Sequence, residues 1–459
     1  MLHRKQDSYQ GGVFSTAESK QELPKDKLPK TSHSSNTIYQ LIKDELILDG
    51  NSRQNLATFC QTWVEPEVEK LMAIAVDKNI VDKDEYPQTA EIEKRCIHII
   101  SDLWHGESSG ESALGTSTTG SSEAAMLGGL ALLRKWQIKR KSQGLDFDKP
   151  NLVTGPVQVC WHKFARYWGV ELREVPMEQD CYQLTPEATI KHCDENTIAV
   201  VATLGLTFTG QYDPIEQIAK ALDEFQLTTS IDVPMHVDAA SGGFVAPFIQ
   251  SDLKWDFRLS RVRSINASGH KFGLTPLGVG WILWHTESDL PDDLVFHVNY
   301  LGGNMPDIAL NFSRPSGQVI AQYYNFLHLG FEGYQAIQST CRDIAIYLAN
   351  EINQLGYFDI IYNGNGGLPV ISWKLKEHIT DFNLYDLADR LRNKGWQVPA
   401  YALPVNQQKT VVQRILVKRG FSKDLACLLM RDYKQAIEHL TSHPRVKSLG
   451  QNEASGFRH

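Results

Sequence analysis

The sequence predicts an α/β fold with a mostly parallel sheet covered by helices, followed by a smaller α+β unit. Between residues 121 and 284, short apolar runs alternate with amphipathic helical patterns, which is typical of β-α-β units. A long helical pattern at Gln318–Leu355 separates this region from the rest. Beyond it we expect alternating strands and helices at Val370–Lys376, Tyr385–Lys394, Val411–Lys418 and Asp424–Leu440.

The elements before the sheet are predicted from local patterns. Residues 1 to about 35 are polar, which is typical of an extended arm or a disordered tail. Apolar residues at helical spacing from Ile38 to Ile47 indicate a short helix, and a second helical stretch is expected over Leu56–Lys78. Ser121–Lys141 is a strong helix prediction, because serines can cap its start and basic residues end it.

Within the α/β region the expected elements follow one another closely. In the order strand, helix, strand, helix and three further strands, they are Asn151–Cys160, Ala165–Gly169, Ile198–Thr203, Ile215–Phe225, Met235–Asp238, Ser264–Ala267 and Val279–Trp284. A parallel sheet binds its ligands at the carboxyl ends of its strands. Residues that follow these strands are therefore candidates for a functional site.

Composition and charge exclude several classes of protein. Lys and Arg number 46 against 54 Asp and Glu, a net charge of −8, so we expect no nucleic-acid partner. No apolar run approaches the ~20 residues of a membrane helix, and the charged N-terminus lacks the apolar core of a signal peptide. The seven cysteines are scattered without a C-x-x-C pair, which indicates reduced thiols, a cytoplasmic protein and no metal site.

Lys271 is the first candidate catalytic residue. It ends the segment Asn266-Ala267-Ser268-Gly269-His270-Lys271, directly after a predicted strand, where an amine can form a Schiff base with an aldehyde. The small neighbours leave room for a bulky ring, and Ser268 and His270 can bind a phosphate group that the ring carries. A surface lysine in a glycine turn is the alternative interpretation.

Asp238 and the segment Gly115–Glu123 complete the pattern. Asp238 ends an apolar strand, and an acid in that place suits the pyridine nitrogen of pyridoxal 5′-phosphate (PLP), although a turn cap is the alternative. Gly115–Glu123 offers amides and hydroxyls at a helix start, which can bind phosphate, and it is neither a Walker motif nor G-x-G-x-x-G. Each signal is weak alone, and together with Lys271 they favour a PLP site.

Several long stretches carry a resemblance to a known family: Leu56–Trp63, Gly120–Ala124, Val157–Trp168, His236–Phe244, Ser268–Gly273, Asn311–Pro315 and Arg419–Phe421. On these motifs the sequence resembles the PLP-dependent group II decarboxylases of the aspartate-aminotransferase fold (fold type I), and among them the bacterial glutamate decarboxylases. The similarity covers nearly the whole chain and thins at the N-terminus.

The resemblance implies which residues hold the cofactor. Lys271 would carry it and Asp238 would face its pyridine nitrogen. Gln158 would lie against the ring, with His162 as the competing candidate, because group II decarboxylases tend to place a His there. The remaining cofactor contacts that the resemblance implies are Ser121, Ser122, Ser268 and His270 at the phosphate, Ser313 from a neighbouring subunit, Thr207 and Ala240.

The resemblance also implies a reaction, the α-decarboxylation of L-glutamate to 4-aminobutanoate (GABA) and CO₂, which consumes a proton and suits acid resistance. Thr58, Asn79 and Asp82 match the family's binders of the distal carboxylate, and Arg419 matches the partner of the other carboxylate. Surface, turn and solvated roles are their alternatives. An aromatic amino-acid decarboxylase, an aminotransferase and a non-enzymatic scaffold are the rival functions.

Assembly and regulation follow from the resemblance alone. It implies a homo-oligomer with the dimer as functional unit, a hexamer in bacterial members, and recruitment to the membrane at acid pH. We expect no calmodulin binding, because the tail after Pro444 lacks Trp and a basic amphipathic helix. His459 matches a family residue that closes the site at neutral pH by adding to the Schiff base, and a plain tail is the alternative.

Three regions are therefore expected along the chain. They are an N-terminal arm with a helical segment at 1–55, a large PLP-binding domain at 56–341, and a small α+β C-terminal domain with a mobile tail at 342–459.

Overall fold

The computed structural model describes residues 26–106, 113–299, 305–443 and 448–454. The chain divides into two compact units, with the boundary in the sequence between Gln54 and Asn55. The first unit contains helix α1 (Ser35–Leu46), as its apolar spacing predicts. Residues 1–25 of the expected arm lie outside the described residues, as does His459. Among the described residues, no helix is long and apolar enough to cross a membrane.

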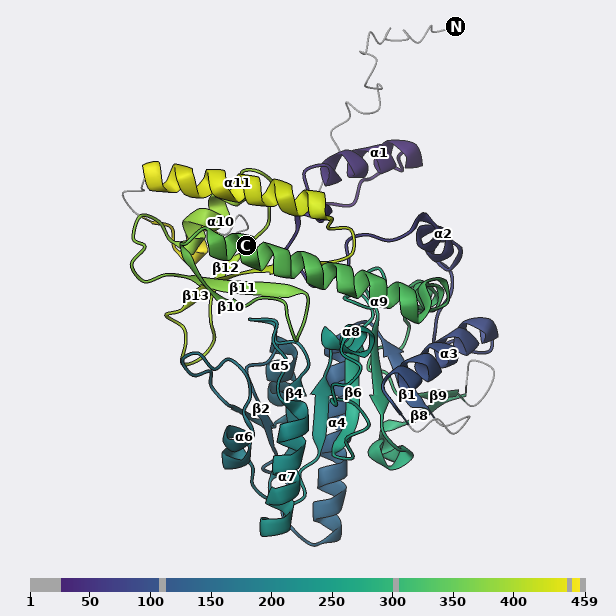
Figure 1. The fold of residues 1–459 in the computed structure, drawn as a ribbon. Helices are drawn as coiled ribbons and strands as arrows, with labels where there is room; N and C mark the ends of the chain where they lie inside the picture. Colours follow the sequence, from purple (N-terminus) through teal and green to yellow (C-terminus); the bar gives the residue numbers. More distant parts are fainter. Residues whose placement is uncertain (1–25, 107–112, 300–304, 444–447, 455–459) are drawn as a thin grey trace, which may run out of the picture. The chain divides into compact units, whose positions relative to one another are not determined.

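A seven-stranded sheet forms the centre of the second unit (Figure 1). Four neighbouring pairs, from β6 across to β3, are parallel, whereas β7 runs antiparallel between β1 and β6. The predicted mostly parallel sheet is confirmed. In order across the sheet, the strands are β1 (Leu114–Thr118), β7 (Gly280–Trp284), β6 (Val262–Ser268), β5 (Met235–Asp238), β4 (Thr197–Thr203), β2 (Asn151–Thr154) and β3 (Glu171–Glu174).

Strand β4 shows how the sheet is covered on both faces. Ala199 and Val201 pack in the core that includes helices α4 and α5, whereas Val200 and Ala202 pack in the core of α3, α7, α8 and α9. Successive side chains of a strand point to opposite faces, so a continuous apolar run is buried on both sides. The helices are α3 (Pro87–Leu103), α4 (Ser121–Ser142), α5 (Val159–Trp168), α7 (Ile215–Thr229), α8 (Ala246–Ile249) and α9 (Gly317–Gln354).

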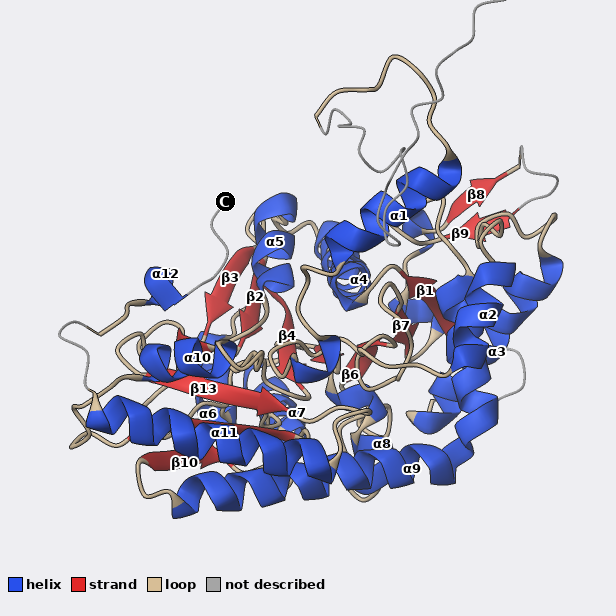
Figure 2. Ribbon diagram, turned by 90° about the horizontal axis from the view of Figure 1, so that it is seen from above, coloured by secondary structure: helices blue, strands red, loops and turns tan. Residues whose placement is uncertain are grey.

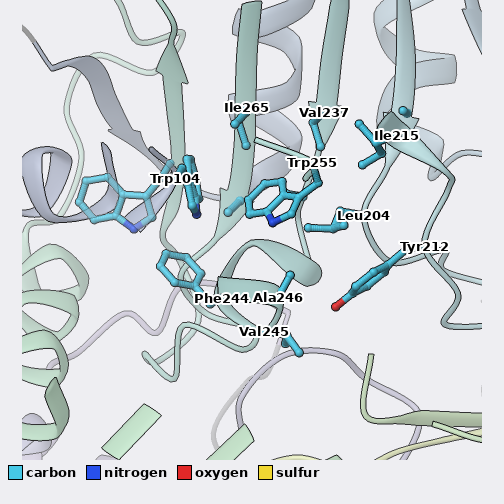
Figure 3. Close-up of a cluster of buried hydrophobic side chains, with 14 of the residues drawn as sticks. Trp104, Leu204, Tyr212, Ile215, Val237, Phe244, Val245, Ala246, Trp255 and Ile265 are labelled. Atoms are coloured by element: carbon cyan, nitrogen blue, oxygen red, sulfur yellow. The ribbon is translucent and has the colours of Figure 1, made fainter. Parts of the chain in front are cut away.

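An aromatic cluster packs against one face of this sheet (Figure 3). The ring centroid of Trp104 lies 6.1 Å from that of Phe244 and 6.1 Å from that of Trp255. The Trp104 indole also donates a hydrogen bond to the Gly243 carbonyl at 2.9 Å. The cluster therefore fixes the segment that leaves β5, directly after Asp238.

A second, antiparallel sheet follows helix α9, and Figure 2 shows it beside α10 and α11. Its strands, in order, are β10 (Phe358–Tyr362), β11 (Val370–Leu375), β13 (Val411–Leu416) and β12 (Ala400–Ala402), and its helices are α10 (Leu384–Arg392) and α11 (Lys423–Ser442). Outside the two sheets lie α2 (Pro66–Ile74), α6 (Pro186–His192), β8 (Phe296–Val298), β9 (Met305–Asp307) and α12 (Gln451–Ala454).

Two element predictions are wrong. Only Pro66–Ile74 of the expected helix Leu56–Lys78 is helical, because the backbone of Leu56 instead bonds to Gln397 and Leu416. The strand expected over residues 151–160 ends at Thr154 and helix α5 begins at Val159, since the proline between them has no N–H for a central strand and the glycine before it weakens one.

Candidate active site

The carboxyl ends of the central strands surround a cavity of about 280 Å³. Strand β5 ends at Asp238, β6 ends at Ser268, and helix α4 begins at Ser121. Ser268 donates a hydrogen bond to the Ser121 hydroxyl at 2.6 Å. The predicted residues that line the cavity are Ser121, Ser122, Gln158, Thr207, Asp238, Ala240, His270 and Lys271.

The Lys271 amine lies in a desolvated part of the cavity. Its Nζ is 3.3 Å from the Ser241 hydroxyl and 5.1 Å from the centroid of the Phe59 ring. Burial lowers the pKa of Lys271, the nearby Arg414 guanidinium acts in the same direction, and the Asp238 carboxylate opposes them. A lowered amine pKa increases the neutral fraction, which is the nucleophilic form.

Three N–H donors orient the Asp238 carboxylate. The Trp161 indole donates to Oδ2 at 2.8 Å, while the Asn266 amide and the Ala240 backbone each donate to Oδ1 at 3.1 Å. The three donors hold both oxygens of the carboxylate, so its orientation in the wall of the cavity is fixed.

Close backbone contact shapes the wall of the cavity at the start of α4. A Cβ added to Gly280 of strand β7 would lie 2.3 Å from the carbonyl carbon of Gly120, so only a glycine lets these segments meet. The contact leaves the start of α4 facing the cavity, where its free N–H groups can bind an anion. Burial, with a smaller contribution from Lys271, lowers the pKa of His270 to about 4, and its Nδ1 accepts the Val279 N–H at 3.2 Å.

Glu123 supports this wall, a role that the sequence did not indicate. Its Oε2 accepts the backbone N–H and the hydroxyl of Thr119, both at 2.8 Å. Its Oε1 accepts the N–H groups of Leu310 and Asn311, both at 3.0 Å. Although burial opposes ionisation, the hydrogen bonds from Thr119 and Asn311 hold the pKa of Glu123 below its ordinary value. Glu123 thus ties the start of α4 to a segment almost 190 residues away.

This donor set fits PLP: a nucleophilic amine, an acid on a neighbouring strand, and hydroxyls at a helix start that suit a phosphate. A family model described as the pyridoxal-dependent decarboxylase conserved domain matches residues 29–376. The chain belongs to this family. PLP is therefore its cofactor, and the predicted fold type I and family resemblance are confirmed.

Curated relatives and solved structures agree with this assignment. A glutamate decarboxylase of Aliivibrio fischeri is 58% identical over 100% of this chain and 99% of its own length. Glutamate decarboxylase beta of Listeria innocua is 47% identical, with both chains fully covered. The structure of a Lactobacillus brevis glutamate decarboxylase has a TM-score of 0.91 and 46% identity, and covers 95% of this chain and 99% of its own.

In this pyridoxal-dependent decarboxylase, the two candidates for the ring contact lie in different places. Gln158 lines the cavity and caps helix α5, where its Oε1 accepts the Cys160 N–H at 2.7 Å. His162 is one turn further along α5, and its Nε2 lies 3.1 Å from Glu174 of strand β3.

Three predicted residues lie together but outside the cavity lining. Asn79 accepts the backbone N–H of Arg314 at 3.1 Å, and its amide is 3.5 Å from the Ser313 hydroxyl. Asp82 accepts the N–H of Glu85 at 3.3 Å in the following turn. Within one chain, Asn79, Asp82 and Ser313 are therefore not brought to Lys271.

Thr58 and Arg419 also lie outside the cavity lining. Thr58 accepts the Cys60 N–H at 3.2 Å, next to the Phe59 ring that faces Lys271. Arg419 makes a two-pronged ion pair with Glu65, with Nη1 3.1 Å from Oε2, and its guanidinium lies 4.6 Å from the Trp63 ring centroid. No group of three or more His, Cys, Asp or Glu side chains that could hold a metal occurs among the described residues.

Proposed function

We propose that the chain decarboxylates L-glutamate to 4-aminobutanoate and CO₂, with one proton consumed per turnover. The observation that carries the proposal is the cavity shared by Lys271, Asp238 and the start of α4, in a chain 58% identical to a named glutamate decarboxylase. When bound, PLP withdraws electrons from the substrate Cα, so that the bond to the carboxylate can break.

Each residue of the cavity is assigned to one part of the bound cofactor. We assign Lys271 to covalent attachment of the cofactor and Asp238 to its ring nitrogen, because the three donors on Asp238 keep its charge in place. Gln158 is assigned to the ring face, since it lines the cavity. The phosphate is assigned to Ser121, Ser122, Ser268 and His270, with further contacts from Thr207 and Ala240.

Lys271 is also the proposed proton donor. Decarboxylation replaces a carboxylate by a proton at Cα, and an amine released from the cofactor can hold that proton beside the reacting carbon. The Phe59 ring covers one side of the amine and hinders its exchange with water. The lowered pKa of Lys271 supports this role, because a weaker base gives up its proton more readily.

Substrate recognition is assigned to Thr58, Asn79, Asp82 and Arg419. We propose that Ser313, Asn79 and Asp82 act in the site of a partner subunit. The contact between Asn79 and Ser313 supports this, because a partner site that receives one of these side chains also receives the other. The functional unit is then a homodimer, with a hexamer as the larger assembly. Arg419 would have to exchange Glu65 for the substrate carboxylate.

Regulation is proposed on the family resemblance. A role in acid resistance follows from the proton consumed, and recruitment to the membrane at acid pH accompanies it. His459 would close the site when its imidazole is neutral, above a pKa of ~6.5, and release it in acid. Changing His459 to Ala should extend activity and the visible absorbance of bound cofactor toward neutral pH, and an unchanged midpoint would contradict this gating.

The central test combines a spectrum with a substrate panel. The purified protein should show the absorbance of lysine-bound PLP and release CO₂ from glutamate far faster than from glutamine, leucine or aromatic amino acids. Lys271→Ala should remove both, while the exposed Lys191→Ala should change neither. Preference for an aromatic substrate would overturn the assignment to glutamate, and transamination without CO₂ would overturn decarboxylation.

A further inference from the structure

Two side chains donate hydrogen bonds to Asp238, those of Asn266 and Trp161, and both contact one further residue, His236. The Asn266 amide donates to Asp238, and the Oδ1 of the same amide lies 2.6 Å from His236 Nε2. The Trp161 ring meets the His236 imidazole edge to face, with 5.1 Å between centroids. His236 is fully buried on strand β5, two residues before Asp238.

This pattern leaves His236 with one consistent tautomer. Asn266 must present its NH₂ group to Asp238, because its carbonyl oxygen would repel the carboxylate. Asn266 Oδ1 therefore faces His236, so Nε2 carries the proton and donates. Nδ1 then accepts from the Ser264 hydroxyl, 2.7 Å away. Burial lowers the pKa of His236, which preserves the neutral ring.

The surrounding core accommodates an imidazole at a position where an aliphatic side chain would cost less desolvation free energy to bury. A Cβ added to Gly128 of helix α4 would lie 2.6 Å from His236 Cε1, so the helix carries a glycine where the ring packs. The strand neighbours Met235 and Val237 are buried and apolar. A buried polar ring is tolerated only when its nitrogens have hydrogen-bond partners, and both partners of His236 are present, which points to a role beyond packing.

We propose that His236 is a positioning residue for Asp238: through Asn266 and Trp161 it holds the carboxylate directed at the ring nitrogen of the bound cofactor. The proposal rests on the role of Asp238 proposed above. His236 is not among the residues that line the cavity, so it acts on the cofactor only through these two donors.

The experiment isolates the contact with the ring nitrogen. The full-length enzyme is loaded with PLP or with an analogue in which CH replaces the ring nitrogen, and the dissociation rate of each is measured on dilution. Both cofactors use Lys271 and the phosphate-binding residues alike, and only PLP has the ring nitrogen that Asp238 would contact. His236→Phe keeps the ring contact with Trp161 but no N–H, whereas His236→Gln keeps an amide N–H near the place of Nε2.

The parent enzyme should hold PLP at least about tenfold longer than the analogue, as a charged contact predicts. His236→Phe should reduce this ratio at least about fivefold by releasing PLP faster, with the analogue rate unchanged within about twofold. His236→Gln should restore most of the ratio. If His236→Phe does not fold, His236→Asn replaces it with the same expectation, because its shorter amide reaches Ser264 and not Asn266.

Two results overturn the proposal, and each has a distinct meaning. If His236→Phe releases both cofactors faster and leaves their ratio unchanged, His236 is merely structural. If the parent enzyme itself shows no preference for PLP over the analogue, the role assigned to Asp238 fails first, and that of His236 fails with it.

Discussion

At position 238, the function of one side chain depends on the donors around it. Both carboxylate oxygens of Asp238 accept N–H groups, from Trp161, Asn266 and the Ala240 backbone. An amide in the same place would turn its NH₂ group toward at least one donor. The charge of Asp238 and its hydrogen-bond geometry are therefore tested by the same substitution.

Asp238→Asn should lower kcat by roughly a hundredfold or more, because the ring nitrogen loses its ionic partner. It should also cost about 1–3 kcal/mol of unfolding free energy, since one buried donor loses its acceptor. Steady-state CO₂ release and denaturant unfolding measure the two effects. Normal turnover in a variant that still binds PLP would contradict the role given to Asp238.

The sequence indicated those residues that follow strands directly. Lys271 and Asp238 were identified because the ends of neighbouring strands meet at one edge of a sheet. The pairing of Arg419 with Glu65 joins residues 354 positions apart, and no local pattern indicates which carboxylate an arginine will contact. The role of Glu123 was not indicated, because its partners at 310 and 311 come from a distant segment.

At the scale of elements, the start of helix α4 depends on Glu123. Its four hydrogen bonds hold the α4 entry and residues 310–311 together. The pKa of Glu123 is lowered in the folded state, so the ionised group stabilises the fold above its ordinary pKa of 4.5, and this contribution is lost as pH falls through the folded value.

Glu123→Gln should lower the unfolding free energy at pH 7 by about 1–3 kcal/mol, because its NH₂ group would face backbone donors. The gap between parent and variant should narrow below pH 4.5, where the parent also becomes protonated. Urea unfolding at several pH values measures it. The exposed Glu187→Gln, also in a first helical turn, is the control and should show little change. A gap that does not depend on pH would contradict this account.

The buried carboxylate of Asp213, which contacts the last residue of strand β4, has the opposite pH behaviour. Asp213 accepts the N–H of Thr203 at 2.7 Å and that of Leu184 at 2.9 Å. Burial raises the pKa of Asp213 to about 7, although these hydrogen bonds oppose it. The folded state therefore binds this proton more tightly than the unfolded state. The resulting stability is complete below pH 3.8 and is lost as pH rises through about 7.

Asp213→Asn removes this titration. The melting temperature of the parent, relative to the variant, should be highest near pH 4 and should decline up to about pH 7. Calorimetry over that range tests it, with the exposed Asp252→Asn as control. A difference that stays constant over this range would show that Asp213 does not titrate there.

At the scale of the whole second unit, one helix joins two cores. The first part of α9 packs with the large sheet and its later part packs with the small one, with a break at Gly330, where φ is 57°. Periodicity predicted the length of this helix but not the break. The break depends on the positive φ of the single residue Gly330, and the spacing of apolar residues does not indicate it. The expected boundary between 341 and 342 falls inside α9 and remains a prediction.

Subunit complementation tests the proposed dimer. If Asp82 serves the site of the partner subunit, co-expressed Lys271→Ala and Asp82→Ala chains form mixed dimers that contain one intact site. Random pairing should then restore about a quarter of the parent activity per subunit. Each variant alone should be nearly inactive. If both residues serve the same chain, every site carries a defect, and co-expression should restore nothing.

The close approach of Gly280 to Gly120 limits how such sequences can diverge. Any side chain at 280 would push against the main chain that presents the start of α4. Close-packed backbone has no free volume to absorb even one methyl group. As such sequences diverge, the hydroxyl side chains along this wall can therefore be substituted one at a time. Strand β7 and the start of helix α4 can change only together, because their backbones are in contact.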